Sequence, residues 1–358
     1  MIPKRPWVAA TLLLLLLMAG YVAVGILVPA GVFKSITPHF SGIEKSLALP
    51  LAGAEDITIS QTGIVFVSAD DRRQHRANPG SHTGALLVMN LHDTVPTFVN
   101  VTPPGLSDFH PHGISLWQGD SVTILFVINH QKQYSRHTVE RFAWRNGVLS
   151  HLETFYDSML MTSPNDLVAV GERSFYVTND HGYAQLGIGR TLEDYLQRAL
   201  SYVNYFDGTA FRKVAEGIAY ANGINQSQDG LYIFVTSTTG RKLLVYNRNP
   251  DTGELSLIRK VNVKTGADNI EVDAHGALWI GCHPQLLKFA KHASDSTKKS
   301  PSQVIKVTDP TGYTYAVEEI YLNDGTTLSG SSVAAVYGQH LLIGSVFENK
   351  ILHCTIKT

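Results

Sequence analysis

Alternating apolar and polar positions divide most of the chain into six similar units. In each unit a polar pair of residues precedes a short alternating run, and a turn leads into a second, more apolar run. Period-two alternation bounded by turn residues predicts β-strands that pair with each other. The six polar pairs are Glu55-Asp56, His112-Gly113, Asn165-Asp166, Asn222-Gly223, Asp268-Asn269 and Ser331-Ser332.

The units recur roughly every 45–65 residues, close to the repeat length of propeller blades. An ordinary β-sandwich without a true repeat is the alternative, but sandwiches do not repeat one strand-turn-strand unit in this way. The segments between units leave room for outer strands, for example at 85–89, 141–144 and 243–246. We therefore predict an all-β chain in which residues 51–358 form a six-bladed β-propeller.

One stretch has helical periodicity instead. Residues 191–194 read as a helix start with an acidic first turn, and apolar residues then recur at helical spacing as far as Val203. We expect this helix either to pack over a loop on the propeller rim or to act as a lid or membrane-facing element near an active site.

The N-terminal segment is apolar throughout. Residues 7–28 carry no charge, and a bilayer-spanning helix needs about 20 apolar residues. A cleaved signal peptide is the alternative, although its apolar region is typically only ~7–15 residues long. Because Lys4 and Arg5 precede the run and positive charge stays cytoplasmic, residues 1–6 are expected to form a cytoplasmic tail, with residues 29–50 as a linker and first-strand region.

This orientation places the body on the luminal or extracellular side of a membrane, or in a secreted protein that retains its signal. Asn100 and Asn225 begin glycosylation acceptor triplets, which are usable only on that side. The chain has 29 Lys and Arg against 30 Asp and Glu, without the basic stripe that nucleic-acid binding needs. Its two cysteines, Cys282 and Cys354, are too few for a disulfide scaffold and are expected to be free thiols.

The polar pairs carry the candidate chemistry. The innermost strand of each propeller blade runs along the central axis, so equivalent positions in different blades converge there. The residues expected to converge are Glu55, Asp56, Asn165, Asp166, Asn222, Asp268 and Asn269. Carboxylates and amides brought together without a cation would repel each other and be desolvated at high cost. Hard oxygen donors in this number favour Ca²⁺ over Zn²⁺ or Mg²⁺. In the alternative reading each residue is a separate turn residue, which is hard to reconcile with four pairs at one position of the repeat.

The same segments resemble the paraoxonase/arylesterase family. The similar segments are AED (54–56), FHPHGIS (109–115), INH (128–130), SPNDLVAVG (163–171), TNDHGY (178–183), AEGIAYANGIN (215–225), DNIEVD (268–273), LWIGCHP (278–284) and GSSVAAVY (330–337). The resemblance runs over nearly the whole body. It implies a six-bladed propeller that holds two calcium ions, and an N-terminal hydrophobic helix that is not cleaved.

The resemblance also implies roles for individual residues. The catalytic calcium would be held by Glu55, Asn165, Asn222, Asp268 and Asn269. The deeper, structural calcium would be held by Asp56, Asp166 and the backbone carbonyl of Ile114. His112 matches the family's proposed general base and His130 its partner histidine. Tyr220 matches an aromatic pocket wall, and His181 and His283 match further family histidines that lie around the site or are structural.

Two departures from the family stand out. The family joins its N-terminal region to its last strand by a disulfide, and here Cys354 has no cysteine partner near residue 44. Ring closure is therefore expected to rest on strand pairing alone. Residues 70–73 (Asp-Asp-Arg-Arg) replace a more apolar segment that borders the family's pocket, which leaves the substrate preference open.

We therefore expect a calcium-dependent hydrolase of lactones and aryl esters, in which the metal polarises the carbonyl and His112 accepts a proton from water. A propeller acting on phosphotriesters or sugar lactones is a second reading. A non-catalytic propeller that binds a partner on its rim, with calcium purely structural, is a third.

Overall fold

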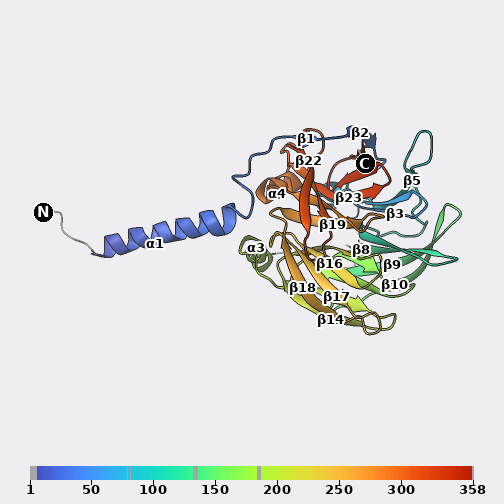
Figure 1. Ribbon diagram of the computed structural model, residues 1–358, viewed down its shortest axis with the longest axis horizontal. Coiled ribbons are helices and arrows are strands. Elements are labelled where there is room, and N and C mark those ends of the chain that lie inside the picture. The colour runs from blue at the N-terminus through green and yellow to red at the C-terminus, as the bar shows by residue number, and fades with distance from the viewer. Residues whose placement is uncertain (1–5, 79, 81, 132–135, 184–186, 357–358) are drawn as a thin grey trace.

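The computed structural model describes residues 6–78, 80, 82–131, 136–183 and 187–356. The strands form six antiparallel sheets around a common axis (Figure 1). The first three sheets, written from the axis outward, are β3 (Ala54–Ile59), β4 (Ile64–Ala69), β5 (Ala85–Asn90), β6 (Val99–Asn100); β7 (Pro111–Gln118), β8 (Thr123–Gln131), β9 (Arg136–Arg145), β10 (Val148–Phe155); and β11 (Pro164–Ala169), β12 (Phe175–Asn179), β13 (Ser201–Phe206), β14 (Phe211–Ile218).

The other three sheets include two strands from the N-terminal region. They are β15 (Ala221–Gln226), β16 (Tyr232–Ser237), β17 (Lys242–Arg248), β18 (Leu255–Asn262); β19 (Gly266–Val272), β20 (Leu278–His283), β21 (Ser302–Thr308), β22 (Ala316–Asn323), β1 (His39–Phe40); and β23 (Ser331–Tyr337), β24 (His340–Ser345), β25 (Lys350–Thr355), β2 (Ile43–Ala48).

The six inner strands form a closed ring. β3, β7, β11, β15, β19 and β23 each contact the next, and β23 returns to β3. The hydrophobic core lies between neighbouring sheets as six clusters, one at each blade interface. The predicted six-bladed propeller is confirmed, and the β-sandwich alternative is wrong. The outer strands expected at 85–89, 141–144 and 243–246 lie within β5, β9 and β17.

The ring is closed by strand pairing. β2 pairs antiparallel with β25, and Glu44 lies opposite Cys354 in this pairing. Cys354 and Cys282 are both free and buried, as the sequence predicted. One sheet is therefore built from both ends of the propeller segment, through hydrogen bonds alone.

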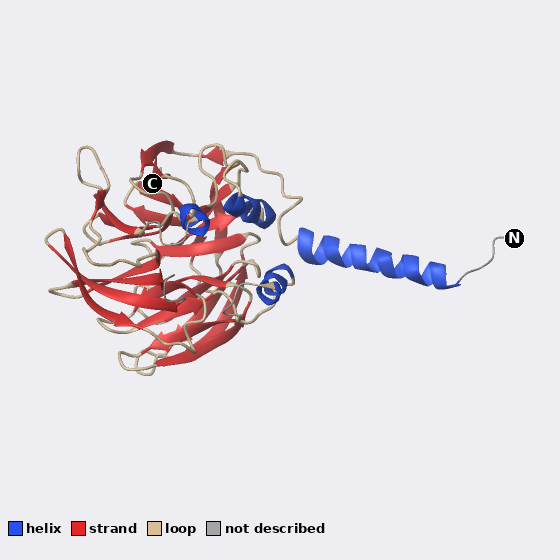
Figure 2. Ribbon diagram, turned by 180° about the vertical axis from the view of Figure 1, so that it is seen from behind, coloured by secondary structure: helices blue, strands red, loops and turns tan. Residues whose placement is uncertain are grey.

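The N-terminal apolar segment is helical, and all but its last turns stand clear of the propeller. Helix α1 (Pro6–Val22) continues into a π-helical turn, η1 (Ala23–Leu27). Figure 2 shows α1 projecting from the strand body. Residues 7–27 are long and apolar enough to cross a membrane, and none of this stretch is buried in the protein. Lys4 and Arg5 and most of the expected tail at 1–6 lie outside the described residues.

Three short helices lie in loops of the propeller: α2 (Arg72–Ala77), α3 (Ile188–Tyr195) and α4 (Leu286–Ser294). α3 corrects the helix predicted from 191 to 203. It begins earlier, and it ends at Tyr195 because Gln197 adopts a left-handed backbone with φ of 51°. Val203 lies instead in β13, whose residues are all buried. The predicted helix was too long because a fully buried strand, such as β13, can also carry apolar residues at helical intervals.

Candidate metal and catalytic site

A β-bulge interrupts every inner strand at its polar pair. The pairing register shifts between Ala54 and Asp56 in β3, and between Ala267 and Ile270 in β19. The shifts in β7, β11 and β15 span the polar pair in the same way, and the shift in β23 spans Ser332 and the residue after it. A bulge leaves residues out of the ladder and re-aims their side chains. The repeat therefore directs the polar pairs toward the axis.

Glycine is the second residue of two pairs for a steric reason. A Cβ on Gly113 would lie 2.6 Å from Cα of Asp166, and one on Gly223 would lie 2.6 Å from Cα of Asn269. Both distances are too short for a real side chain. These glycines let neighbouring inner strands approach closely enough for their polar residues to meet.

Several buried oxygens of the predicted calcium ligands have no hydrogen-bond partner within the described part of the chain. They are Glu55 Oε2, Asn165 Oδ1, Asn222 Oδ1 and Asn269 Oδ1. Leaving a buried acceptor unsatisfied typically costs about 1–3 kcal/mol. Bare oxygens from four different blades are the donor set that a hard cation requires.

The three amides are held so that their oxygens stay bare. The Nδ2 of Asn165 donates to Asp180 Oδ2 at 3.2 Å, and the Nδ2 of Asn222 donates to Thr238 Oγ1 at 3.0 Å. The Nδ2 of Asn269 donates to Glu55 Oε1 at 3.0 Å. Each amide Nδ2 therefore donates to a neighbouring side chain. These hydrogen bonds fix the orientation of the amide group before any ligand binds.

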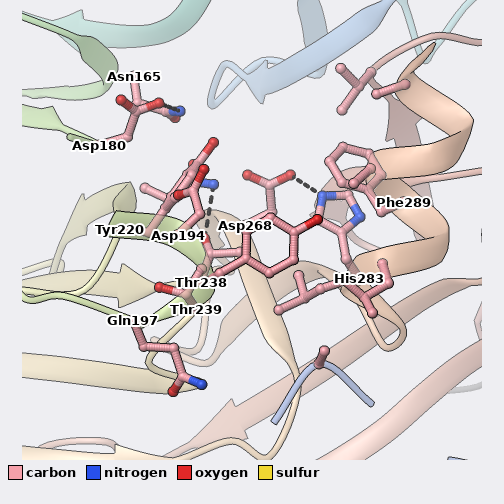
Figure 3. A pocket seen from close by; sticks show the side chains of 18 of the residues that line it. Asn165, Asp180, Asp194, Gln197, Tyr220, Thr238, Thr239, Asp268, His283 and Phe289 are labelled. Carbon is pink, nitrogen blue, oxygen red and sulfur yellow. Dashed lines mark hydrogen bonds and ion pairs between the residues drawn. The ribbon is translucent and has the colours of Figure 1, made fainter. Parts of the chain in front are cut away.

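Asp268 belongs to the same group and has a histidine partner. Nε2 of His283 lies 2.8 Å from Asp268 Oδ2, the pair joined by a dashed line in Figure 3. The His283 ring stacks on Phe289, with ring centroids 3.6 Å apart. His283 thus orients a predicted ligand and also forms part of the pocket wall.

The deeper pair, Asp56 and Asp166, accepts backbone N–H groups across blade boundaries. Asp56 Oδ2 accepts from the N–H of Ile114 at 2.7 Å, and Asp166 Oδ2 accepts from Ile224 at 2.8 Å. Both side chains are buried. Ile114, whose carbonyl the family resemblance assigns to the deeper ion, is therefore adjacent to Asp56.

Burial makes these acids reluctant to ionise. It raises the pKa of Glu55 to about 8, against the opposing charge of Arg72. It raises the pKa of Asp56 to about 7, and the pKa of Asp166 well above its usual range, with the charge of Asp56 adding to the latter. A cation at the axis would favour the charged carboxylates.

The two predicted catalytic histidines lie side by side. The rings of His112 and His130 have centroids 4.8 Å apart. His112 Nε2 lies 3.6 Å from Glu55 Oε1, and its Nδ1 lies 2.8 Å from Nη2 of Arg72. His130 Nδ1 lies 2.7 Å from Nδ1 of His137, a histidine to which the sequence assigned no role.

A cavity of about 350 Å³ opens above these groups. Its lining includes Glu55, Asn165, Asn222, Asp268 and His112 from the inner strands and the neighbouring loops. Figure 3 shows Tyr220 and Phe289 among its side chains. The walls are predominantly apolar, and the predicted calcium ligands Glu55 and Asp268 are among the ionisable groups that line the cavity.

Of the other predicted pocket residues, Tyr220 lines the cavity and His181 stands behind it. Their rings are 4.8 Å apart, and His181 binds Asp180 at 2.6 Å and Asp194 at 2.9 Å.

Of the two asparagines that begin glycosylation acceptor triplets, Asn100 is exposed. The amide of Asn225 instead donates to the carbonyl of Ile270 in the next blade, so Asn100 is the accessible one.

A family model described as Arylesterase matches residues 42–356. The chain belongs to the arylesterase family. Human serum paraoxonase/arylesterase 1 is 36% identical over 312 residues, which cover 85% of this chain and 86% of that protein. Rat serum paraoxonase/arylesterase 2 is 32% identical over 315 residues, with the same coverage of 85% and 86%. The resemblance read from the sequence is confirmed.

Solved structures share the arylesterase fold at low identity. A luciferin-regenerating enzyme superposes with a TM-score of 0.56 at 13% identity, over 88% of this chain and 96% of that one. A gluconolactonase from Xanthomonas campestris superposes with a TM-score of 0.55 at 14% identity, over 90% and 94%. At these identities the likeness shows the fold alone.

The arylesterase pocket also contains residues that the sequence did not reveal. Helix α4 contributes Phe289, and the loop after β24 contributes Phe347. Leu286, Ala290 and Ala293 recur along α4 at helical spacing and line the cavity, a pattern that would have predicted this helix. Asp180 lies in a segment used for the resemblance, but its hydrogen bond to Asn165 joins the end of β12 to the inner strand β11, a contact that the sequence does not reveal.

The base of the N-terminal helix reaches the pocket. Ile26, Pro29 and Ala30 line the cavity. The Nε2 of Gln197 donates to the carbonyl of Gly25 at 2.8 Å. The backbone N–H of Leu286 donates to the carbonyl of Ala30 at 2.9 Å. The region around α3 is therefore a pocket-side element that contacts the helix base.

Proposed function

We propose that this protein is a calcium-dependent hydrolase of carboxylic esters, acting above all on lactones and aryl esters. Its membership of the arylesterase family supports ester hydrolysis. The observation that carries the proposal is the group of bare, buried oxygens that ends the cavity beside His112.

The family resemblance implies two calcium ions, and the bare oxygens support the one nearer the cavity. Glu55, Asn165, Asn222, Asp268 and Asn269 would hold the ion nearer the cavity. Asp56, Asp166 and the carbonyl of Ile114 would hold the deeper one. Calcium bound there would supply a Lewis acid for the substrate carbonyl.

The chain's own residues would bind the substrate and move the proton. The apolar walls around Tyr220 and Phe289 would hold the acyl or aryl part of the substrate and exclude water. His112, at the polar end of the cavity, would take a proton from the attacking water at its unprotonated nitrogen. The adjacent His130 would accept or orient that proton, with His137 fixing the His130 ring.

The experiment is a substrate panel on the full chain in detergent, with calcium and with EGTA. Phenyl acetate, a long-chain lactone and an organophosphate triester are compared. We expect the lactone and the aryl ester to be turned over only with calcium, and EGTA to lower the melting temperature because calcium binds the native state. Turnover of the triester alone would show that the substrates are phosphotriesters and not carboxylic esters. No turnover of any substrate, with or without calcium, would contradict the enzyme. Unchanged melting and activity in EGTA would contradict calcium dependence.

We also propose that residues 7–28 anchor the propeller to a membrane, with the body on the luminal or extracellular side. The length of the apolar helix and the exposure of Asn100 support this arrangement. Intact mass and N-terminal sequencing of the mature protein test it. A mature chain that begins near residue 26 would show that the segment is a cleaved signal peptide.

A further inference from the structure

A second group of metal-ligating side chains lies outside the axis. Asp70 follows the end of β4, His82 precedes β5, and His110 precedes β7. The loop that leaves β4 carries α2 and returns through His82, while His110 approaches from the loop between β6 and β7. The fold thus brings one carboxylate and two imidazoles together from three separate positions of the chain.

The ligand atoms of these residues converge within 4.8 Å of one another. Asp70 Oδ1 lies 3.2 Å from Nε2 of His82 and 3.1 Å from Nδ1 of His110. The side chains of Asp70 and His110 are 6% and 2% exposed, and that of His82 is 12% exposed. With metal–ligand distances of about 2.0–2.1 Å, neighbouring ligands of a tetrahedral Zn²⁺ site are about 3.3 Å apart. The two separations from Asp70 Oδ1 are within a few tenths of an ångström of that value, and the two imidazole nitrogens lie within 4.8 Å of each other.

The outer nitrogen of His110 faces a second carboxylate. His110 Nε2 lies 3.5 Å from Asp108 Oδ1. A metal-bound histidine characteristically directs its other N–H to a carboxylate, which fixes the tautomer that leaves the inner nitrogen free to bind. The Nδ1 of His82 has no hydrogen-bond partner among the described residues, so it can carry the proton that metal binding at Nε2 requires. His75 of α2 packs on His110, with ring centroids 4.2 Å apart.

We propose that Asp70, His82 and His110 bind a divalent transition metal of the Zn²⁺ class. Two nitrogens and one carboxylate oxygen suit zinc and its neighbours, whereas the oxygen donors at the axis suit calcium. The metal fastens the loop of α2 to the start of β7. That loop carries Arg72, which contacts His112 at the pocket. The site is independent of whether the axis binds calcium.

The test is a titration of the full chain in detergent, stripped with EDTA and returned to excess calcium. Zn²⁺ is added in a calorimeter, and Co²⁺ is added in parallel because its visible absorption reports the ligand geometry. We expect one equivalent of Zn²⁺ to bind in the presence of calcium, and Co²⁺ to develop visible bands in the same stoichiometry. His82→Gln and Asp70→Asn are each expected to weaken Zn²⁺ binding at least tenfold.

His92→Gln is the matched control, because His92 is exposed and lies outside the cluster. It should bind Zn²⁺ like the parent chain. If it loses Zn²⁺ as His82→Gln does, or if the parent binds no Zn²⁺ above background, the proposal is wrong. The melting temperature of the parent chain is a readout that no variant's misfolding can affect. It should rise with Zn²⁺ in excess calcium, and no rise would also overturn the site.

Discussion

Nη2 of Arg72 lies 2.8 Å from Nδ1 of His112. A guanidinium has no acceptor, so Nδ1 is the acceptor and the proton of a neutral His112 is on Nε2. The lone pair that would take a proton from water is therefore occupied by Arg72. In the proposed reaction, Arg72 must release His112 before proton transfer.

Replacing the guanidinium should make this release unnecessary. Arg72→Met keeps the aliphatic length and frees Nδ1. A hydrogen bond worth about 0.5–1.5 kcal/mol net corresponds to a gain in kcat of roughly two- to tenfold. Steady-state kinetics on an uncharged lactone checks this, with Arg212→Met, in an exposed ion pair with Glu254, as control. A fall in kcat would mean that Arg72 orients His112 instead of blocking it.

Substitutions of His112 and Asn269 should impair different steps, proton transfer and calcium binding respectively. His112→Gln leaves every predicted ligand in place, so calcium affinity should persist while lactone hydrolysis falls by roughly 10²–10⁴-fold. Asn269→Ala removes one of the bare oxygens and should weaken calcium binding as well. Rates measured against free calcium concentration separate the two. Full lactonase activity in His112→Gln would show that a group other than His112 is the general base.

Thr238 should control calcium affinity without being a ligand. Its Oγ1 accepts the Nδ2 of Asn222 and donates to the carbonyl of Ala267 at 2.7 Å. Thr238→Val removes the acceptor and lets the amide turn, which should weaken calcium binding by roughly 10–100-fold. Thr238→Ser retains the hydroxyl and should bind like the parent. Calorimetric titration with calcium compares the three, and equal affinities would show that the amide is held by other contacts.

His181 should make stability depend on pH in the alkaline range. Burial alone would lower the pKa of His181, but its hydrogen bonds to Asp180 and Asp194 raise that pKa to about 9. Because the folded-state pKa exceeds the unfolded value, near 6.5, this stabilisation is fully present below about pH 6.5 and is lost as pH rises through about 9.

His181→Gln should remove that loss, a difference on the order of 1–3 kcal/mol across the window. Asp194→Asn deletes one of the two partners and should give an intermediate slope. Urea unfolding at pH 6, 7.5 and 9 measures both. A parent chain whose free energy of unfolding does not fall more steeply over this range than that of His181→Gln would contradict the prediction.

A cysteine at position 44 should close the ring covalently. Glu44 lies opposite Cys354, and directly paired strand residues are within the distance range that a disulfide spans. Burial, with the charge of Glu44, raises the pKa of the Cys354 thiol to about 12, so Glu44→Cys also removes a barrier to thiolate formation. The bridge should stabilise the fold by at most on the order of 5 kcal/mol.

Thiol counting and melting temperature with and without reductant check the bridge. Lys45→Cys is the control, because adjacent residues of a strand point to opposite faces. A bridge in Lys45→Cys but not in Glu44→Cys would show that the register differs.

The sequence predicted those parts of the molecule that repeat. The polar pairs and inner strands could be predicted because each blade repeats the same alternation of apolar and polar residues. The ring of blades then brings equivalent positions together. The residues that orient two of them directly follow the second strand of their blades, and they differ in type from blade to blade. Asp180 reaches Asn165, and Thr238 reaches Asn222, through strand pairing whose side-chain geometry no local pattern encodes. The same holds for Asp70 and His110, which are joined only when two blades pack. The helix at 191 was overextended because apolar spacing does not reveal where Gln197 turns the backbone.

The pairing of β2 with β25 links the completion of the propeller to protein synthesis. β2 leaves the ribosome before any blade has formed, whereas its partner emerges only after the inner strands of all six. During that interval β2 lacks its neighbour, and an unpaired strand edge readily recruits other chains. If α1 is held in the membrane, it tethers the waiting strand close to the growing blades and away from other nascent chains. A chain that stops before Lys350 would keep that edge open permanently, so loss of β25 should cause aggregation even though every predicted metal ligand is present.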